Sequence, residues 1–347
     1  MNRKTTRLLF VLLVVLAASF IAALCLGALM ISPKQVMAIV LNAIGIDTGI
    51  PFEDVQAEVL LSLRLPRIVL AVLVGAALAV SGAVLQGVFR NPLVDSGLIG
   101  IGSGASLFAA MYILAGSFVP VLLSGNPSLT LAFVAFVGAG ITTATVYRIS
   151  RFQQSIHVTM LILAGVALNA ICGALTGLMT YLATESELRD LTFWTLGSLG
   201  GATWGNNLIL AVFVVIPFFF LLRLSRSLDA FALGEQSAYF LGVDIRRTKL
   251  IAFVCTTAMV GASVSFVGSI GFIGLVIPHI LRAIIGPGHR NLIVLSAVAG
   301  AILLCLSDLI SRTILMPTEV PVGIITALFG TPVLLVIIIR QKKRLFV

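Results

Sequence analysis

Few side chains in this sequence could do chemistry, and the most informative are three arginines, Arg64, Arg67 and Arg312. An arginine guanidinium forms paired, charge-assisted hydrogen bonds with carboxylates and tolerates desolvation better than an ammonium. One arginine at the end of an apolar segment often only extends its charge to the interface. Three of them favour an anionic counterpart, which is either a docking protein with carboxylates or a carboxylate-bearing substrate.

Groups of residues typical of catalysis are missing from the apolar segments. These segments contain no paired carboxylates, no histidine cluster and no nucleophile beside a base, which disfavours a membrane-embedded enzyme. No glycine is followed by lysine, so the chain has no GxxxxGK[ST] phosphate-binding loop. The four cysteines lie inside apolar runs without metal-ligand spacing, so we expect buried thiols, no metal site and no bound cofactor.

The elements that must position the arginines are membrane-spanning helices. Of the 347 residues, 59% are hydrophobic and 10% are charged, whereas about a quarter are charged in an average soluble domain. These values exclude a soluble enzyme, a disordered chain and a nucleic-acid-binding protein. The apolar runs are continuous, which disfavours a β-barrel with its alternating strands. We predict an all-α polytopic membrane protein in one domain, 1–347, with ten spans near residues 8–31, 66–88, 98–120, 129–149, 157–183, 206–224, 250–270, 272–286, 291–312 and 318–340.

The distribution of basic residues predicts the direction of the spans. The first apolar run is too long for the core of a signal peptide, which has about 7 to 15 residues, so it is taken as a span. Basic residues concentrate in cytoplasmic loops. With both termini in the cytoplasm, most of the 22 basic residues lie inside, and those left outside are Lys34, Arg64, Arg67, Arg189 and Arg312.

An internal similarity suggests an inverted repeat, a common feature of transporters. The stretch RIVLAVLVGAALAVSGAVLQG at 67–87 resembles KLIAFVCTTAMVGASVSFVGS at 249–269, with Ser81 aligned to Ser263. Each stretch is followed by a similar tetrapeptide, GLIG at 97–100 and GFIG at 271–274. The alternative is that any two helices rich in Ala, Gly and Val look alike.

The longest predicted cytoplasmic loop contains a segment, 225–245, that could receive energy from a partner. It holds two consecutive units of eight residues, 227–234 and 235–242, and each ends in glycine as short helices do. Two helical turns cannot bury the apolar side chains of these units. An amphipathic pair lying on the bilayer is one interpretation, and a docking site for a soluble partner is the favoured one. Without a phosphate loop, the chain needs an external energy source or is a passive channel.

Several stretches resemble the permease subunits of ABC importers for iron chelates, haem and cobalamin, the FecCD/BtuC type. They are RLPR at 64–67, SGAVLQGVFRNPLVDSGLIGIGSGA at 81–105, LGEQSAYFLGV at 233–243, GFIGLVIPHILR at 271–282 and SDLISRTILMPTEVPVGIITALFGTPVLLVIIIR at 307–340. The resemblance implies the BtuC-like fold of a type II importer, in a homodimer in the bilayer of the bacterial inner membrane. It also implies two cytoplasmic ATPase subunits that hold ATP and magnesium, and an extracytoplasmic substrate-binding protein.

The resemblance also implies roles for individual residues. Those matching the family's docking arginines are Arg64, Arg67 and Arg312. Those matching its coupling helices are Leu233, Gly234, Glu235, Ala238, Leu241 and Gly242. Those falling in its gate loops, which border the translocation path, are Asn91, Pro92, Leu93, Ser155 and His157. Residues that could touch a flat macrocycle at the mouth are Phe193 and Trp194.

The cargo is the least constrained expectation. The stretch LRDLTFWTLGSLGGATW at 188–204 looks most like haem permeases, so haem is favoured, with a ferric siderophore close behind and cobalamin further off. The alternative of another class is a secondary transporter driven by an ion gradient. Such transporters usually carry carboxylates or histidines inside the membrane, and few are evident here.

Overall fold

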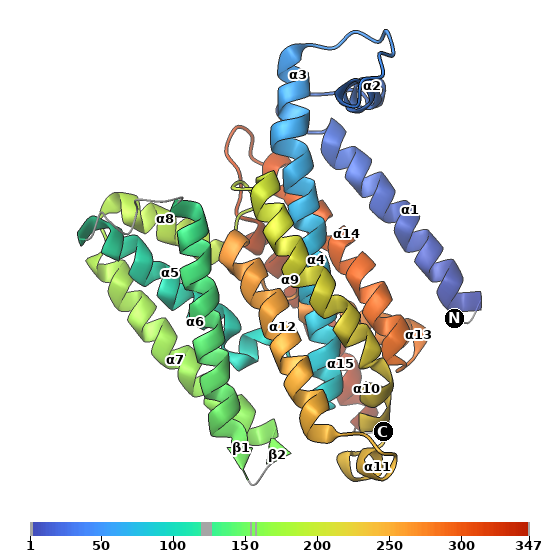
Figure 1. The fold of residues 1–347 in the computed structure, drawn as a ribbon, viewed down its shortest axis with the longest axis vertical. Coiled ribbons are helices and arrows are strands. Elements are labelled where there is room, and N and C mark those ends of the chain that lie inside the picture. The colour runs from blue at the N-terminus through green and yellow to red at the C-terminus, as the bar shows by residue number, and fades with distance from the viewer. Residues whose placement is uncertain (1–2, 119–126, 153–154, 157, 346–347) are drawn as a thin grey trace.

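The computed structural model describes residues 3–118, 127–152, 155–156 and 158–345, and they form an almost entirely helical bundle (Figure 1). The long or apolar helices are α1 (Arg3–Cys25), α4 (Leu65–Phe89), α5 (Ile101–Phe118), α6 (Pro127–Ser150), α7 (Val158–Leu182), α9 (Trp204–Arg223), α12 (Ile245–Val267), α13 (Ile273–Ile285), α14 (His289–Thr313) and α15 (Val322–Leu345). The short ones are α2 (Pro33–Ala43), α3 (Asp54–Glu58), α8 (Glu185–Leu196), α10 (Ser225–Phe231) and α11 (Glu235–Phe240). A π-turn η1 (Val59–Arg64), a 3₁₀ turn η2 (Ser96–Ile99) and a two-stranded hairpin of β1 (Arg151–Phe152) and β2 (Ser155–Ile156) complete the described chain.

The polytopic helical fold predicted from composition is confirmed. Within the described residues, seven helices are long and apolar enough to cross a membrane: α1, the continuous helix Asp54–Phe89, α6, α7, α9, α12 and α14. Three shorter apolar helices, Ile101–Gly116, Ile273–Ile285 and Val322–Val336, lie where the other three spans were expected. By length and composition, seven of the ten predicted spans are therefore helices that could cross a membrane.

Helix α4 forms the centre of the bundle because its small residues allow close packing. It contacts α14, α12, α13 and α9, and nearly all of its side chains beyond Val74 are buried. A Cβ atom on Gly75 would lie 2.3 Å from the carbonyl oxygen of Gly300 in α14, so the two backbones touch. Small residues give helices this approach where lipid supplies no hydrophobic driving force.

The N-terminal region differs from the prediction. The first helix ends at Cys25 and not at Ile31, and a second helix, α2, follows. Ser32 caps α2 through the backbone N–H of Gln35, and Pro33 occupies its first turn, where a missing N–H costs nothing. The predicted outer loop before residue 66 is partly helical, because α3 and η1 continue into α4. A π-turn placed just before Pro66 accommodates a residue that cannot donate a backbone hydrogen bond.

The two ends of the bundle carry different elements. The end with α2 and α3 is called the upper end here, and the end with α10, α11 and the hairpin is called the lower end (Figure 1). Helix α4 descends from the upper end, whereas α12 rises from the lower end beside it (Figure 1). The start of α1 and the end of α15 both lie in the lower half (Figure 1).

Candidate functional site

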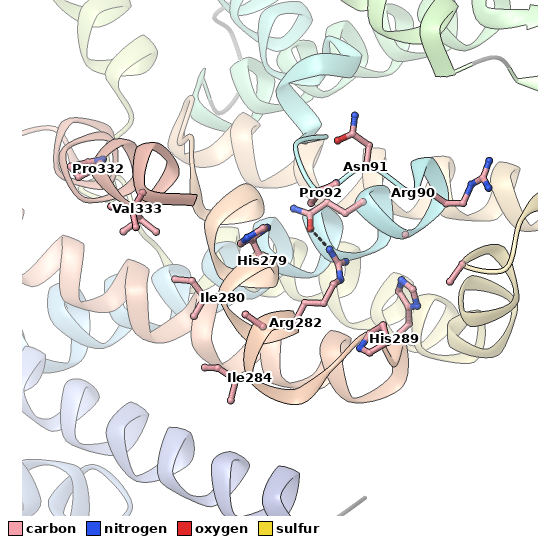
Figure 2. Close-up of a pocket in the computed structure, with 16 residues that line it drawn as sticks. Arg90, Asn91, Pro92, His279, Ile280, Arg282, Ile284, His289, Pro332 and Val333 are labelled. Carbon is pink, nitrogen blue, oxygen red and sulfur yellow. Dashed lines mark hydrogen bonds between the residues drawn. The ribbon is translucent and has the colours of Figure 1, made fainter. Parts of the chain in front are cut away.

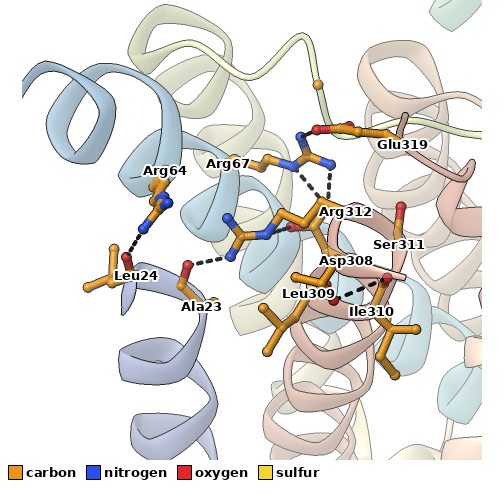
Figure 3. A network of polar contacts seen from close by, with 12 residues as sticks. Ala23, Leu24, Arg64, Arg67, Asp308, Leu309, Ile310, Ser311, Arg312 and Glu319 are labelled. Carbon is orange, nitrogen blue, oxygen red and sulfur yellow. Dashed lines mark hydrogen bonds and ion pairs between the residues drawn. The ribbon is translucent and has the colours of Figure 1, made fainter. Parts of the chain in front are cut away.

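Two of the three predicted docking arginines cap the end of α1. The last carbonyl groups of a helix have no partner within the helix. The guanidinium of Arg64 donates to the carbonyl oxygens of Leu24 and Leu29, and that of Arg312 donates to the carbonyl oxygen of Ala23 (Figure 3). Only 5% of Arg64 is exposed. These arginines therefore stabilise the upper end of α1 from η1 and α14.

The third arginine, Arg67, joins α4 to two carboxylates. Its guanidinium lies 2.8 Å from the buried carboxylate of Asp308 in α14 and 2.9 Å from that of Glu319, in the segment before α15 (Figure 3). Asp308 also faces Arg312, at 3.7 Å. The structure thus brings Arg64, Arg67 and Arg312 together at the upper end, in a cluster where Glu319, 47% exposed in its side chain, is the carboxylate open to solvent.

The lower end carries the predicted pair of short helices, α10 and α11. Each is followed by glycine with a positive φ, 107° at Gly234 and 82° at Gly242, which only glycine adopts without strain. Exposed apolar side chains crowd this segment: Leu233, Tyr239, Phe240 and Leu241. Ala238 is fully buried, so among the predicted coupling residues it faces the chain and not a partner.

An ion pair and a hydrogen-bonded pair connect these short helices to membrane-spanning helices. Glu235 at the start of α11 lies 2.8 Å from the ammonium of Lys249 in α12, which is 3% exposed. Asp229 in α10 accepts hydrogen bonds from the backbone N–H of His289, the first residue of α14, and contacts its ring Nδ1. The imidazole in turn lies against Gly87 of α4. Helices α10 and α11 are therefore linked by polar contacts to α12 and α14, and through the imidazole of His289 to α4.

The predicted gate residues lie in two separate places. Arg90 ends α4 in the left-handed conformation, with φ 50°, and Asn91 then accepts a hydrogen bond from the backbone N–H of Leu93. Asn91 and Pro92 line a cavity, whereas Leu93 is exposed. Ser155 belongs to the hairpin at the lower end of α6 and α7. His157 lies outside the described residues.

The cavity beside Asn91 has a volume of about 1190 Å³. The end of α4, α13, the start of α14 and α15 surround it (Figure 2). Its polar side chains include Arg282 and His279 of α13, and Arg282 donates to the side-chain oxygen of Gln86, at 3.0 Å. Within the described residues, no group of three His, Cys, Asp or Glu side chains could hold a metal ion.

The predicted mouth residues lie on α8, away from the lower cavity. Phe193 is exposed, and the guanidinium of Arg189 lies 5.9 Å from the centre of its ring. Trp194 is half-buried against the core, and its carbonyl oxygen accepts a hydrogen bond from the backbone N–H of Ser269. The side chain of Phe193 is therefore available for contact with a ligand. Trp194 instead packs against the core, and its backbone carbonyl joins α8 to the segment after α12.

Sequence reasoning missed several ionisable residues in or beside the apolar helices. Lys249, Asp229, His289 and Arg282 had no predicted role, and half-buried Asp95 accepts a hydrogen bond from the backbone N–H of Ser96 at the start of η2. A signal was present in each case, because an ionisable residue in or beside an apolar segment predicts a partner or a function. Apart from Ser96, which is adjacent to Asp95, the partners lie 14 or more residues away in the sequence and could not be named.

Comparisons with known proteins agree with this geometry. The model of the FecCD transport family matches residues 13–340. The chain is 41% identical over 292 residues to the hemin transport system permease protein HmuU of Yersinia pestis, covering 84% of this chain and 86% of that protein. It is 37% identical to the Fe(3+)-citrate import system permease protein YfmE of Bacillus subtilis, covering 99% of each. It is 40% identical to the vitamin B12 import system permease protein BtuC of Citrobacter koseri, covering 81% and 83%.

A solved structure has the same fold. A chain described as an inward-facing conformation of a metal-chelate type ABC transporter superposes with a TM-score of 0.82 at 31% identity, covering 96% of this chain and 99% of that one. The chain therefore belongs to the FecCD transport family, whose members are multi-pass permease subunits of ABC importers, without catalytic activity or a bound cofactor of their own.

Proposed function

We propose that this chain is the permease of an ATP-driven importer that moves an iron complex, with haem favoured, into the cytoplasm of a bacterium. The observation that carries the proposal is the segment 225–245, in which α10 and α11 expose apolar side chains and are joined to α12, α14 and α4. An ATPase that binds these side chains and moves would displace the central helices through these contacts. Family membership supplies the same partner, because ABC permeases work with ATPase subunits.

The upper arginine cluster supports the docking of a substrate-binding protein. Arg67 is held in part by Glu319, whose carboxylate is open to solvent, so a carboxylate of a docking protein can take its place. The guanidinium groups of Arg64 and Arg312 already donate hydrogen bonds to carbonyl oxygens at the end of α1. In this proposal they contribute positive charge beneath the docking surface. In this proposal the upper end faces the periplasm or the cell exterior, and both termini are cytoplasmic.

Haem is favoured over a ferric siderophore, ferric citrate and cobalamin. Permeases named for hemin, Fe(3+)-citrate and vitamin B12 are all similar to this chain, and the hemin permease has the highest identity of the three. Exposed Phe193 near the upper end offers an aromatic face to a flat macrocycle. Weak contacts of this kind suit a path that must release its cargo.

The finer architecture of the proposal has ten spans, an inverted repeat and a homodimer. The opposed directions of α4 and α12, each followed by a Gly-X-Ile-Gly tetrapeptide at a helix break, support the repeat. Ser81 and Ser263, the aligned serines, are both fully buried. The path would run between two copies, with Asn91, Pro92, Leu93, Ser155 and His157 near its inner gate.

Reconstitution tests the proposal. Vesicles containing this chain and its ATPase, supplied with haem-loaded binding protein outside and ATP inside, should accumulate haem, and omission of either partner should abolish uptake. The double variant Phe240→Asp/Leu241→Asp should lose ATPase binding in co-purification, whereas Phe240→Leu, which keeps the apolar contact, should retain it. ATPase binding by the double variant would contradict the docking role of this segment.

The competing function is transport driven by an ion gradient. The carboxylates of half-buried Asp95 and buried Asp308 are groups that could couple an ion. Asp308, however, is already paired with Arg67, which leaves little of its charge for a cation. Uptake by the chain alone, driven by a proton or sodium gradient without nucleotide, would replace the proposal with this one.

A further inference from the structure

Helix α2 is apolar on two faces, and the described chain covers only one of them. The helix contacts α1 and η1, and its buried apolar residues are Val36, Ala38 and Ile39. The opposite side, called the outer face here, carries three exposed apolar side chains spaced by three and four residues: Met37, Val40 and, directly after the helix, Ile44. A helix that is apolar all round is normally covered all round. The outer face therefore needs an apolar partner.

The outer face of α2 follows from the exposed side of α1. More than half of each of the side chains of Phe10, Val14 and Ile21 on α1 is exposed. Because α1 is long and apolar enough to cross a membrane, these side chains face lipid in a polytopic membrane protein. Met30, in the turn between the two helices, is 70% exposed. Exposed apolar side chains thus continue along the chain from the lipid-facing side of α1 onto α2.

The direction of α2 suits a helix that lies in the plane of the membrane. It is seen end-on across the upper end of α1, whereas α1 and α4 run along the plane of the view (Figure 1). Its 11 residues extend about 16 Å, too short to cross a hydrocarbon core of about 30 Å. Lys34, the charged residue of α2, is exposed, and its long stem can bring the ammonium to the level of the lipid headgroups. Helices of this kind lie at the boundary between headgroups and acyl chains.

The surroundings of α2 favour lipid over a protein partner. Helices α1 and α2 lie on the side of the bundle away from α5–α8, which hold the proposed mouth and the hairpin of the proposed gate (Figure 1). The exposed carboxylates of this region follow α2 in the chain, and they are Asp47, Glu53, Asp54 and Glu58. The surface suited to water or to a soluble protein therefore begins after the outer face of α2 ends.

We infer that the outer face of α2 is embedded in the membrane leaflet at the upper end, and that this contact sets the depth of the arginine cluster. The two are connected because α2 packs against η1, which ends at Arg64. Arg64 in turn donates to the carbonyl oxygens of Leu24 in α1 and Leu29 in the turn before α2. The inference concerns this chain and its bilayer, and it depends on neither the cargo nor the ATPase.

Tryptophan fluorescence locates the outer face of α2. Met37→Trp is placed in nanodiscs of phosphatidylcholine, and the emission that it adds to that of Trp194 and Trp204 is measured. Lipid brominated in the upper part of its acyl chains should quench most of the added emission, whereas the water-soluble quencher acrylamide should quench little of it. Asp54→Trp, on the acidic segment, is the control and should show the reverse. Val40→Trp provides a second position if Met37→Trp does not fold.

A change of polarity tests the same contact without tryptophan. In the same nanodiscs, Met37→Asp/Ile44→Asp should speed amide hydrogen exchange in residues 33–43 several-fold, because the acyl chains no longer hold the helix. Met37→Leu/Ile44→Leu, which keeps the outer face apolar, is the matched control and should leave the exchange unchanged.

Three results would overturn the inference. Quenching of Met37→Trp by acrylamide and not by brominated lipid would place the outer face in water. Protection from both quenchers would place a protein there, either a second copy of this chain or a docking protein. Unchanged amide exchange in the aspartate variant would show that the bilayer does not hold α2.

Discussion

The carboxylate of Asp229 and the first residue of α14, His289, make two contacts of 2.8 Å with each other, one through the backbone N–H and one through ring Nδ1. His289 is 5% exposed, and its ring lies against Gly87 of α4. The pair therefore connects a short helix of the lower end to two central helices of the bundle. A displacement of α10 would therefore act directly on α14 and α4.

Replacing Asp229 with alanine should uncouple the ATPase from transport. The substitution removes a hydrogen bond to a charged group, about 1.5 to 3 kcal/mol, and leaves the buried end of α14 without its acceptor. We expect transport per ATP hydrolysed to fall several-fold, with faster amide hydrogen exchange in residues 225–231. Asp244→Ala is the matched control, because Asp244 caps α12 at the same end by accepting a hydrogen bond from the backbone N–H of Arg247 within that helix. Unchanged coupling in Asp229→Ala would contradict the prediction.

The pair of Lys249 and Glu235 should behave as a unit. Glu235→Gln leaves the buried ammonium of Lys249 without its counter-ion, a loss of about 3 kcal/mol, at the low end of the range for buried pairs because Glu235 is partly exposed. Thermal unfolding in detergent should show a clear fall in Tm. The double variant Glu235→Gln/Lys249→Met should recover most of it, since no buried charge remains. Additive effects of the two single changes would show that the pair is not coupled.

Seven of the ten predicted membrane spans match helices long and apolar enough to cross a membrane, because each is encoded by a local run of apolar residues. The short pair α10 and α11 could also be predicted, from the two units that end at Gly234 and Gly242. The end of α1 could not be predicted from the apolar run, which continues to Ile31. In the structure α1 ends at Cys25, where Arg64 and Arg312 donate hydrogen bonds to its last carbonyl groups.

The polar contacts of the site lay beyond sequence reasoning for the same physical reason. Arg67 and Asp308 are 241 residues apart, and Asp229 and His289 are 60 apart, so no local pattern relates them. Arg64 and Arg67 could be recognised as unusual, yet the carbonyl groups and carboxylates that they meet could not. The docking, coupling and gate roles stay predictions, and the structure supplies the contacts by which each can be tested.

Gly82 is one of the positions where an added methyl group should be most damaging. A Cβ atom there would lie 1.8 Å from the carbonyl oxygen of Gly274, at the start of α13. Because both atoms are held by backbone, α13 must move away from α4, at a cost of several kcal/mol, as in severe overpacking. Gly82→Ala should lower Tm and impair transport. Gly140→Ala in α6, where nothing lies within 4 Å of the new atom, should be neutral or stabilising by up to about 1 kcal/mol.

In the proposed docking, Glu319 competes with a carboxylate of the binding protein for Arg67, so its removal should strengthen docking. The Glu319 carboxylate lies 2.9 Å from Arg67 and is half-exposed, which limits the strength of the pair to roughly 0.2 to 1 kcal/mol. Glu319→Gln should therefore lower the Kd for the binding protein by about two- to fivefold, and the gain should shrink as salt screens the charges. Arg67→Glu should raise the Kd strongly. Glu58→Gln, at the same end and with the same change in net charge, separates this local effect from a general one. An equal gain from Glu58→Gln, or weaker docking by Glu319→Gln, would show that the Glu319 carboxylate is not the competitor at Arg67.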